Sequence, residues 1–377
     1  EGLDLTFTLT LSTISAKAVT VTVATSLNGT ASAMDLTEIS ESITIAAGEL
    51  TATIAVSTFN DTTDEDNKTF SVVLSSPVNA TIDDGTGQGT ILDNDAVPVL
   101  TVSSTSATEG EDITFTFVLS AISEKTISFD YGIIDSSFNG TATEGEDFIA
   151  SGDVMTLNPG VLTATVSFTT IVDNLDEFDE TFKITLNSPT NVNLMYTLAT
   201  GTILDGDTPP SLRVSDASAT EGDDMIFTVT LSTISAKEIS VSAFTELGGT
   251  ASAVDISSGS HALFFSAGVL TRTFAVSTVE DTTDEPDETF NITLRYPTNS
   301  TIDDGHAIGT ILDDDAVPNL SVSDANASEG DDITFVLTLS QASGKTVSVD
   351  VTTDLDGTAD SMDLTERTET VTFSPGQ

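Results

Sequence analysis

The chain has 377 residues, of which 60 are acidic and 10 are basic, so its net charge at pH 7 is -50. This charge repels nucleic acid and anionic membrane surfaces and excludes both as partners on electrostatic grounds. Hydrophobic residues make up 38% of the chain and alternate with Thr and Ser, which indicates a folded protein rather than a disordered one, and no apolar run is long enough to insert into a bilayer.

Four copies of one unit follow each other along the chain. The pair Glu-Gly recurs at Glu1, Glu109, Glu221 and Glu329, and the triplet GTA begins at Gly29, Gly140, Gly249 and Gly357. The sequences ILDND, ILDGD and ILDDD close the first three copies. We therefore divide the chain into repeat 1 (1–98, without its first strand), repeat 2 (99–210), repeat 3 (211–318) and a truncated repeat 4 (319–377). Without an initiator Met or a signal-peptide pattern, the chain is expected to be a fragment of a longer protein.

Repeat 3 shows the unit most clearly, and its apolar residues alternate with a period of two. In chain order the predicted strands are 211–216, 225–232, 238–244, 262–266, 270–278, 289–294 and 307–312. About seven short antiparallel strands per repeat predict an all-β fold of tandem immunoglobulin-like β-sandwiches. The short connectors DAVP, DGDTPP and DDDAVP contain proline, so we expect an elongated, fairly stiff rod in which each repeat contacts its neighbours.

Strand parity predicts where the loops of repeat 3 lie. We label the seven predicted strands A to G in chain order. If successive strands run antiparallel, the A–B turn, the C–D loop, the E–F loop and the end of strand G share one pole of the sandwich. Fourteen of the 18 acidic residues of repeat 3 then lie at this acidic pole. A solvated surface would not be so polarised, although a solvated pole that binds no ion remains the alternative.

Oxygen clusters of this kind favour a hard divalent cation. Calcium accepts six to eight oxygen ligands in irregular geometry, whereas magnesium requires a strict octahedron. Zinc would need His or Cys, and the two histidines, His261 and His306, do not recur in the other repeats. The chain has no cysteine, which also excludes disulfides. The sequence contains no EF-hand loop, so the predicted Ca²⁺ ligands come from loops that only folding brings together.

The repeated motifs resemble those of the Calx-beta domain, which occurs in the regulatory loop of sodium/calcium exchangers and in long surface proteins. The motifs are VSDASATEGDD at 214–224, then GTA, then EDTTDEPDETF at 280–290, and GTILDDD at 309–315. The resemblance extends over essentially the whole chain. It implies an immunoglobulin-like fold and calcium bound by acids of the first strand, the E–F loop and the terminal acidic run.

Carried over by this resemblance, the ligands of repeat 3 are Asp216, Glu280, Asp281, Glu285, Asp313, Asp314 and Asp315. Those of repeat 2 are Asp173, Glu177, Asp205 and Asp207, while Ser104, Asn139 and Gly206 stand at three further positions. Those of repeat 1 are Asp61, Glu65, Asp93 and Asp95. Repeat 4 offers only Asp324 and Asp356 and contains no E–F loop.

The residues of the chain bear on four possible functions. No carboxylate pair is unique to one repeat, so no enzyme is expected. Tandem copies, proline linkers and the lack of cysteine favour a calcium-binding extender or adhesion segment of a large cell-surface or secreted protein, whose ligand on a cell surface or matrix the sequence does not identify. The alternative is a regulatory calcium sensor attached to a membrane transporter. Carbohydrate binding is disfavoured because the chain has no Trp and only three Tyr.

Overall fold

The computed structural model describes residues 1–134 and 140–377, and the chain divides into two compact units. The first unit comprises 1–173 and 179–205, and the second comprises 174–178 and 206–377. Every regular secondary-structure element in the described residues is a β-strand, which confirms the predicted all-β class. Within these residues, no helix has the length and apolar character needed to cross a membrane.

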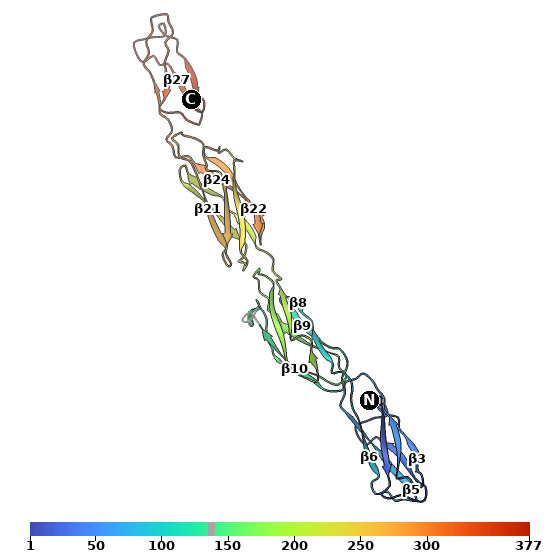
Figure 1. The fold of residues 1–377 in the computed structure, drawn as a ribbon. Coiled ribbons are helices and arrows are strands. Elements are labelled where there is room, and N and C mark those ends of the chain that lie inside the picture. Colours follow the sequence, from blue (N-terminus) through green and yellow to red (C-terminus); the bar gives the residue numbers. More distant parts are fainter. Residues whose placement is uncertain (135–139) are drawn as a thin grey trace. The chain divides into compact units, whose positions relative to one another are not determined.

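Repeat 3, in the second unit, is a sandwich of two sheets (Figure 1). One sheet has the order β21-β18-β16-β23 and the other the order β17-β24-β22-β19-β20. The strands are β16 (Ser211–Val214), β17 (Ala217–Thr220), β18 (Asp224–Leu231), β19 (Ile239–Glu246), β20 (Ser260–Phe265), β21 (Thr271–Ser277), β22 (Glu288–Thr298), β23 (Thr301–Asp304) and β24 (His306–Leu312).

Nine strands therefore replace the seven expected in this repeat, because β17 and β23 were not predicted. The predicted strand 211–216 is found as β16, which pairs antiparallel with β18, and β17 follows it and pairs parallel with β24 in the other sheet. The short strand β23 adds a parallel partner on the free edge of β16. The two additional strands cover two edges that would otherwise be exposed.

Repeats 1 and 2 lie mainly in the first unit and follow the same plan. Repeat 1 contains β1 (Asp4–Thr10), β2 (Val19–Ser26), β3 (Ser40–Ile45), β4 (Thr51–Ser57), β5 (Lys68–Val78) and β6 (Thr86–Ile91). Repeat 2 contains β7 (Val99–Val102), β8 (Thr105–Thr108), β9 (Asp112–Leu119), β10 (Ile127–Ile134), β11 (Asp153–Leu157), β12 (Thr163–Thr169), β13 (Glu180–Thr190), β14 (Asn193–Leu194) and β15 (Leu198–Leu204). Two short first strands in different sheets recur there, since β7 pairs antiparallel with β9 and β8 pairs parallel with β15.

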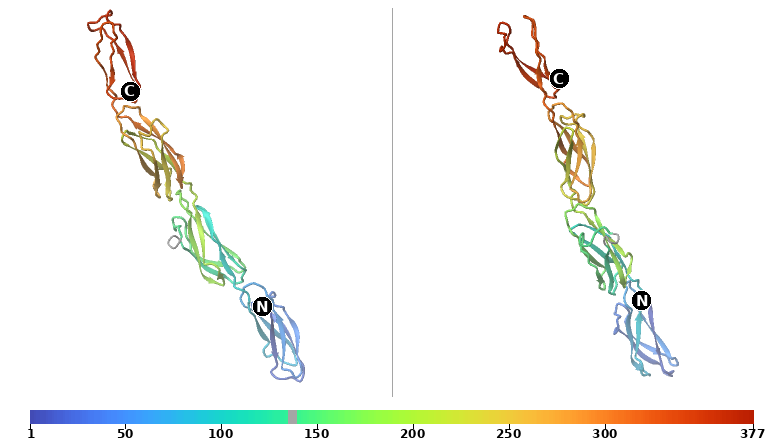
Figure 2. Two further views of the ribbon diagram at one scale, coloured as in Figure 1. Left: turned by 45° about the horizontal axis from the view of Figure 1, so that its top comes forward. Right: turned by 90° about the vertical axis from the view of Figure 1, so that its left-hand side faces the viewer.

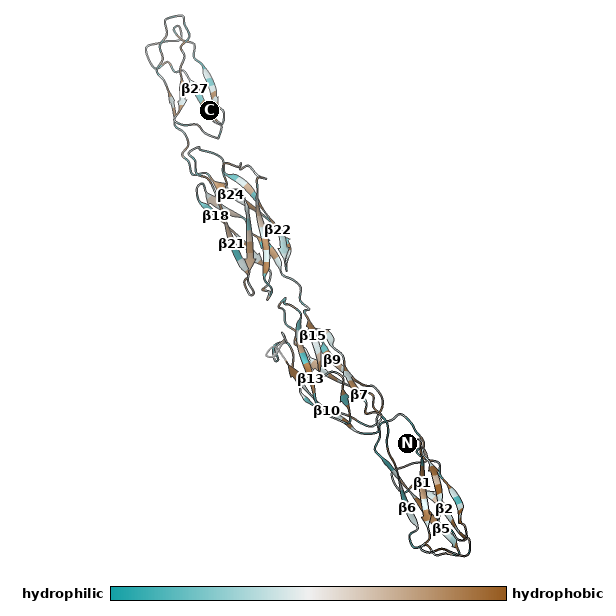
Figure 3. Cartoon of the chain, viewed as in Figure 1, coloured by the Kyte–Doolittle hydropathy of each residue, from teal (hydrophilic) through white to brown (hydrophobic). Residues whose placement is uncertain are grey.

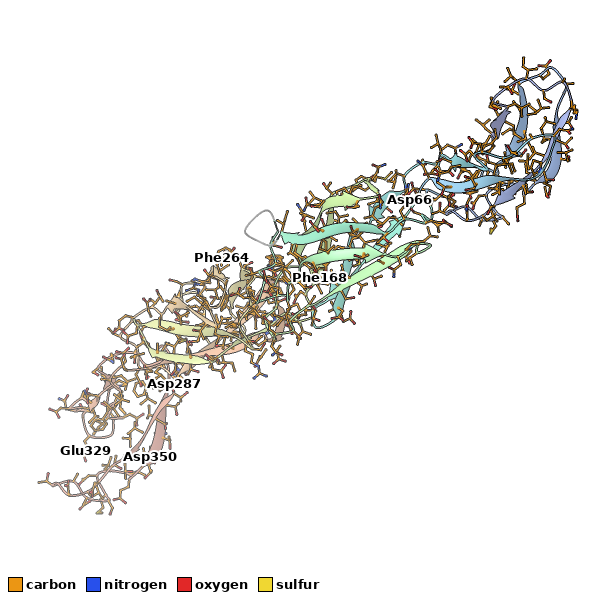
Figure 4. All side chains as sticks on the ribbon, turned by 90° about the horizontal axis from the view of Figure 1, so that it is seen from below. Asp66, Phe168, Phe264, Asp287, Glu329 and Asp350 are labelled. Atoms are coloured by element: carbon orange, nitrogen blue, oxygen red, sulfur yellow. The ribbon has the colours of Figure 1, made fainter. Side chains whose placement is uncertain are left out.

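Each of repeats 1 to 3 has its own apolar core, built from the inward-facing residues of its strands (Figure 3). In repeat 3 the Phe227 ring stacks on Phe274 at 5.4 Å and meets Phe290 edge-on at 5.9 Å. Figure 4 labels one core residue, Phe168, which is 1% exposed, and one outward-facing residue, Phe264, which is 57% exposed. Burying a Phe side chain contributes about 1.5–3 kcal/mol to folding. The alternating apolar residues, which face inward, therefore supply most of the stabilisation of each core.

Repeat 4 differs, because none of its described residues joins a buried apolar cluster. It contains two separate strand pairs, β25 (Leu320–Val322) with β26 (Leu337–Leu339) and β27 (Val347–Thr352) with β28 (Thr368–Phe373). Both views of Figure 2 draw most of this repeat, at the red end of the chain, as thin coil. Apolar residues that would face a core, such as Phe335, remain 46% exposed.

Candidate metal centre

Three carboxylates from three different loops meet at the acidic pole of repeat 3. Glu221 comes from the turn between β17 and β18, Asp281 from the E–F loop between β21 and β22, and Asp315 from the segment after β24. One oxygen of each lies within 4.8 Å of the others. Strand parity predicted that these loops share a pole, and the structure confirms it.

The Glu-Gly motif has a structural reason at this position. Gly222 has a φ of 75°, a conformation that residues with a side chain rarely adopt. A Cβ added to it would also lie 2.6 Å from Oε2 of Glu280. The glycine therefore lets the turn bring Glu221 to the pole, and it places the predicted ligand Glu280 directly beside that turn.

Burial and the repulsion between neighbouring carboxylates raise pKa values in this cluster. Burial, followed by the charges of Asp281 and Asp313, raises the pKa of Glu221 to about 7. The pKa of Asp315 is also raised, by burial and by the charge of Asp281. The described residues provide no basic side chain in ion-pair contact with Glu221, Asp281 or Asp315.

The other predicted residues of repeat 3 have different surroundings. Asp313 accepts a hydrogen bond from the Glu285 amide (3.0 Å) and an ion pair from Lys345 of repeat 4 (2.8 Å). Although burial opposes it, these two partners lower the pKa of Asp313. Asp314 is exposed. Asp216 lies outside the group of three carboxylates, and its Oδ1 accepts a hydrogen bond from the Ile308 amide (2.7 Å).

Repeat 1 repeats the arrangement with Glu1, Asp61 and Asp95, whose oxygens again lie within 4.8 Å of one another. In Figure 1 the N-terminus lies at the end of repeat 1 from which the chain continues to repeat 2, as this grouping requires. The remaining predicted residues are paired with lysines. Glu65 contacts Lys68 at 2.5 Å, and Asp93 contacts Lys125 of repeat 2 at 3.4 Å.

The predicted residues of repeat 2 fall into both units, so they are described separately. Asp173 and Asp205 belong to the first unit, and the Asp205 amide donates to Asp179 at 3.2 Å. Glu177 and Asp207 belong to the second unit, and both are half-buried. Asn139 lies outside the described residues. In repeat 4, Asp324 and Asp356 are both exposed.

Glu1 and Glu221 are members of the two clusters that the ligand prediction missed. The signal was present in the sequence, because the Glu-Gly pair is the most regular marker of the repeat. The glutamate of this pair marks the start of each repeat, and the predicted ligands do not include it. Only the geometry shows that its carboxylate reaches Asp281 and Asp315.

The clusters fit a hard divalent cation. Their donors are all carboxylate oxygens, the set that Ca²⁺ prefers. Oδ2 of Asp315 is buried and has no hydrogen-bond partner, and the same holds for Oδ2 of Asp95 and Oε2 of Glu1 in repeat 1. A buried carboxylate oxygen without a partner is unfavourable unless a cation contacts it, so these atoms mark the positions where an ion would be stabilised.

Comparison with known proteins identifies one family along the whole chain. The sequence model of a family described as "Calx-beta domain" matches four segments, 4–96, 93–207, 205–315 and 313–377. A search of curated proteins found no match.

Solved structures similar to parts of the chain include three Calx proteins. The CBD12 crystal structure from CALX1.2 is 19% identical, covers 57% of this chain and 100% of its own, and has a TM-score of 0.29. The calcium binding domain CBD12 of CALX1.1 is 21% identical over 52% of this chain and 79% of its own, with a TM-score of 0.28. The apo-form Calx CBD1 domain is 26% identical over 30% of this chain and 100% of its own, with a TM-score of 0.28.

Proposed function

Because the chain belongs to the Calx-beta family, with four matched domains in tandem, we propose that it is a calcium-binding, non-catalytic extender segment of a large cell-surface or secreted protein. One observation carries the calcium assignment. Glu221, Asp281 and Asp315 converge within 4.8 Å, and a buried oxygen of Asp315 has no partner. Calcium at this position would neutralise the carboxylates and hold three loops of the pole together.

The residues that would hold the ion follow from this geometry. In repeat 3 they are Glu221, Asp281 and Asp315, with Glu285 and Asp313 adjacent. In repeat 1 they are Glu1, Asp61 and Asp95. The ion would supply positive charge and link the loops to one another, and the chain's own residues would hold it in position. Asp281 is already positioned by a hydrogen bond that its Oδ1 accepts from the Thr283 amide (2.6 Å).

Calorimetric titration of the whole chain with Ca²⁺ tests the assignment. The double variant Asp281→Asn/Asp315→Asn should lose the binding step of repeat 3. The matched control is Asp303→Asn/Asp304→Asn, which removes the same charge from the β23 end of repeat 3. Equal binding curves for the two doubles would refute the site, because a diffuse acidic surface responds only to total charge.

The extender role makes a separate prediction. The chain has no cysteine, so a pair of fluorophores can be attached at two introduced cysteines, one in repeat 1 and one in repeat 3. We expect Ca²⁺ to narrow the distribution of distances between them, because loops fixed at each acidic pole also fix the start of the next repeat. A distribution that Ca²⁺ leaves unchanged would contradict the stiffening role.

Affinity distinguishes the extracellular location that we propose from an intracellular sensor. Extracellular calcium modules have dissociation constants of about 10⁻⁴–10⁻³ M, whereas sensors lie at about 10⁻⁷–10⁻⁵ M. Titration of the whole chain should therefore give values in the weaker range. Micromolar or tighter binding would favour the regulatory module.

A further inference from the structure

One loop of each repeat carries a serine and a lysine two residues apart, which we call the serine–lysine loop. The four copies are Ser15–Lys17, Ser123–Lys125, Ser235–Lys237 and Ser343–Lys345. In all four, the lysine amide donates to the serine hydroxyl at 3.0–3.1 Å. The serine carbonyl also accepts a hydrogen bond at 2.8–2.9 Å from a glycine amide further along the same repeat. The loop therefore has one conformation throughout the chain.

Three of these loops hold a buried aspartate from an E–F loop of the preceding repeat. The aspartates are Asp64, Asp176 and Asp284, each 1–3% exposed. The serine hydroxyl donates to the carboxylate at 2.7–2.8 Å, and the lysine ammonium donates to its other oxygen at 2.6–2.8 Å. The amide between serine and lysine donates to the aspartate carbonyl at 2.9 Å, and in each case the aspartate precedes the serine by 59 residues.

These contacts satisfy the aspartate completely. A buried carboxylate is costly unless it is paired and hydrogen-bonded, and here a hydroxyl and an ammonium meet it on both oxygens. The three serines are 2% exposed, so the loop is closed over its partner. The arrangement recognises an aspartate in extended backbone, because it reads the side chain and the carbonyl together.

The loop of repeat 1 has the same shape and a different environment. Ser15 is half-buried and Lys17 is exposed. Within the part of the chain that the structure describes, no carboxylate lies within ion-pair distance of Lys17 and no acceptor is within hydrogen-bond reach of the Ala16 amide. The hydrogen bonds from the Lys17 and Gly48 amides to Ser15 are already present, so the loop backbone is preorganised before any aspartate arrives. The Ser15 hydroxyl donates to the Lys17 carbonyl (2.8 Å) and would turn from it to the carboxylate.

We propose that Ser15–Lys17 is a docking site for the E–F-loop aspartate of a Calx-beta repeat joined ahead of repeat 1. The geometry at the three other loops identifies the partner, and the positive charge of Lys17 complements the acidic E–F loop. The site is a repeat-to-repeat interface and needs no metal ion.

The test extends the chain by one repeat. Residues 211–328 are placed ahead of Glu1, so that 319–328 precede Glu1-Gly2 as they precede Glu329-Gly330. The core of repeat 3 is formed entirely by its own residues, so the added copy can fold. Its Asp284 then precedes Ser15 by the same 59 residues as in the three existing pairs. The readout is hydrogen exchange at the Ala16 amide, with the Glu124 amide as the protected reference.

We expect Ala16 to exchange at least about tenfold more slowly in the extended chain than in the 377-residue chain. Ser15→Ala, or Asp284→Ala in the added copy alone, should return it to the faster rate. Ser15→Ala keeps the test valid if the Asp284 variant fails to fold. Fast exchange at Ala16 in the extended chain, with Glu124 still protected, overturns the proposal. Protection in the unextended chain that grows with concentration also overturns it, because the partner would then be a second molecule.

Discussion

The acidic poles of repeats 1 and 3 are built from the same loops, but at one position beside the E–F loop repeat 1 has a lysine and repeat 3 has a glutamate. In repeat 1, Lys68 lies 2.9 Å from Asp35 and 2.5 Å from Glu65. In repeat 3 the residue at this place is Glu288, which faces Asp255 and Glu285. One repeat therefore carries an internal cation where the other carries an additional carboxylate.

The protonation states show the consequence. Although burial opposes it, the hydrogen bonds to Glu65 and Asp35 raise the pKa of Lys68, so its charge is retained. In repeat 3, burial and the neighbouring Asp255 raise the pKa of Glu288 to about 7. Burial also raises the pKa of Glu65 in repeat 1 to about 7, although Lys68 opposes the shift. We therefore expect the two repeats to differ in how strongly they depend on calcium, according to the side chain at the position of Lys68 and Glu288. In Figure 4, Asp66 and Asp287 mark these two E–F loops.

Replacing the lysine of repeat 1 by an acidic residue should have the largest effect on stability. Lys68→Glu in calcium-free solution leaves Asp35 and Glu65 facing a third carboxylate, and we expect a loss of about 3–5 kcal/mol from repeat 1. Hydrogen exchange of β5, compared with β22 in the same molecule, measures it. Lys17→Gln, a lysine of the same repeat without a carboxylate partner, is the control. A loss equal to that of the control would show that Lys68 does not balance the pole.

The second-largest effect should be a difference between the two repeats in the stability that they lose when calcium is removed. At a calcium concentration one hundred times the dissociation constant, binding contributes about 2.7 kcal/mol. A chelator should therefore weaken the protection of β22 by that order, and that of β5 by less, because Lys68 remains in place. Glu288→Lys should make repeat 3 resemble repeat 1 in this comparison. Equal losses in both strands would contradict the assigned role of Lys68.

The pH dependence should differ in size between the two repeats, because two glutamates of repeat 3 and one glutamate of repeat 1, Glu65, have pKa values raised to about 7. Glu221 and Glu288 have pKa values raised to about 7 in the folded state, above the ordinary value of 4.5. The folded state then binds protons more tightly than the unfolded state, so ion-free repeat 3 loses stability as pH rises from about 4.5 to about 7. Exchange rates corrected for intrinsic pH dependence should show this loss in β22. The double variant Glu221→Gln/Glu288→Gln should remove most of it, because Glu285 and Asp315 also have raised pKa values and retain a smaller part. An unchanged slope in this variant would assign the effect to other groups.

The smallest effect should come from the exposed middle residue of the terminal acidic run. Asp314 in repeat 3 corresponds to Asn94 in repeat 1, and both are exposed. Asp314→Asn should reduce calcium affinity only about twofold to threefold, because an exposed charge acts through water. Calorimetry of this variant beside Asp315→Asn gives the comparison. A loss of tenfold or more would make Asp314 a direct ligand, as the resemblance to the family implies.

Most of the fold was predictable from local patterns. Alternation of apolar residues identified the strands and the inward-facing Phe227 and Phe290, because a side chain on a strand faces the core at every second position. The acidic pole was predictable for the same reason, since strand parity decides which loops share an end. The number of strands was not, because β17 lies beyond the predicted strand 211–216 and its parallel pairing with β24 depends on the edge available in the second sheet.

The sequence by itself determined the repeats, the β class and the collection of carboxylates on one set of loops. The tertiary structure decided which of those carboxylates meet. It brought Glu221 to Asp281 and Asp315, and it placed Asp216 against the Ile308 amide instead. It also buried Asp284 against a serine and a lysine of the next repeat. These partners are about 30 to 90 residues apart, and whether such groups touch depends on how loops close in three dimensions, which no local pattern encodes.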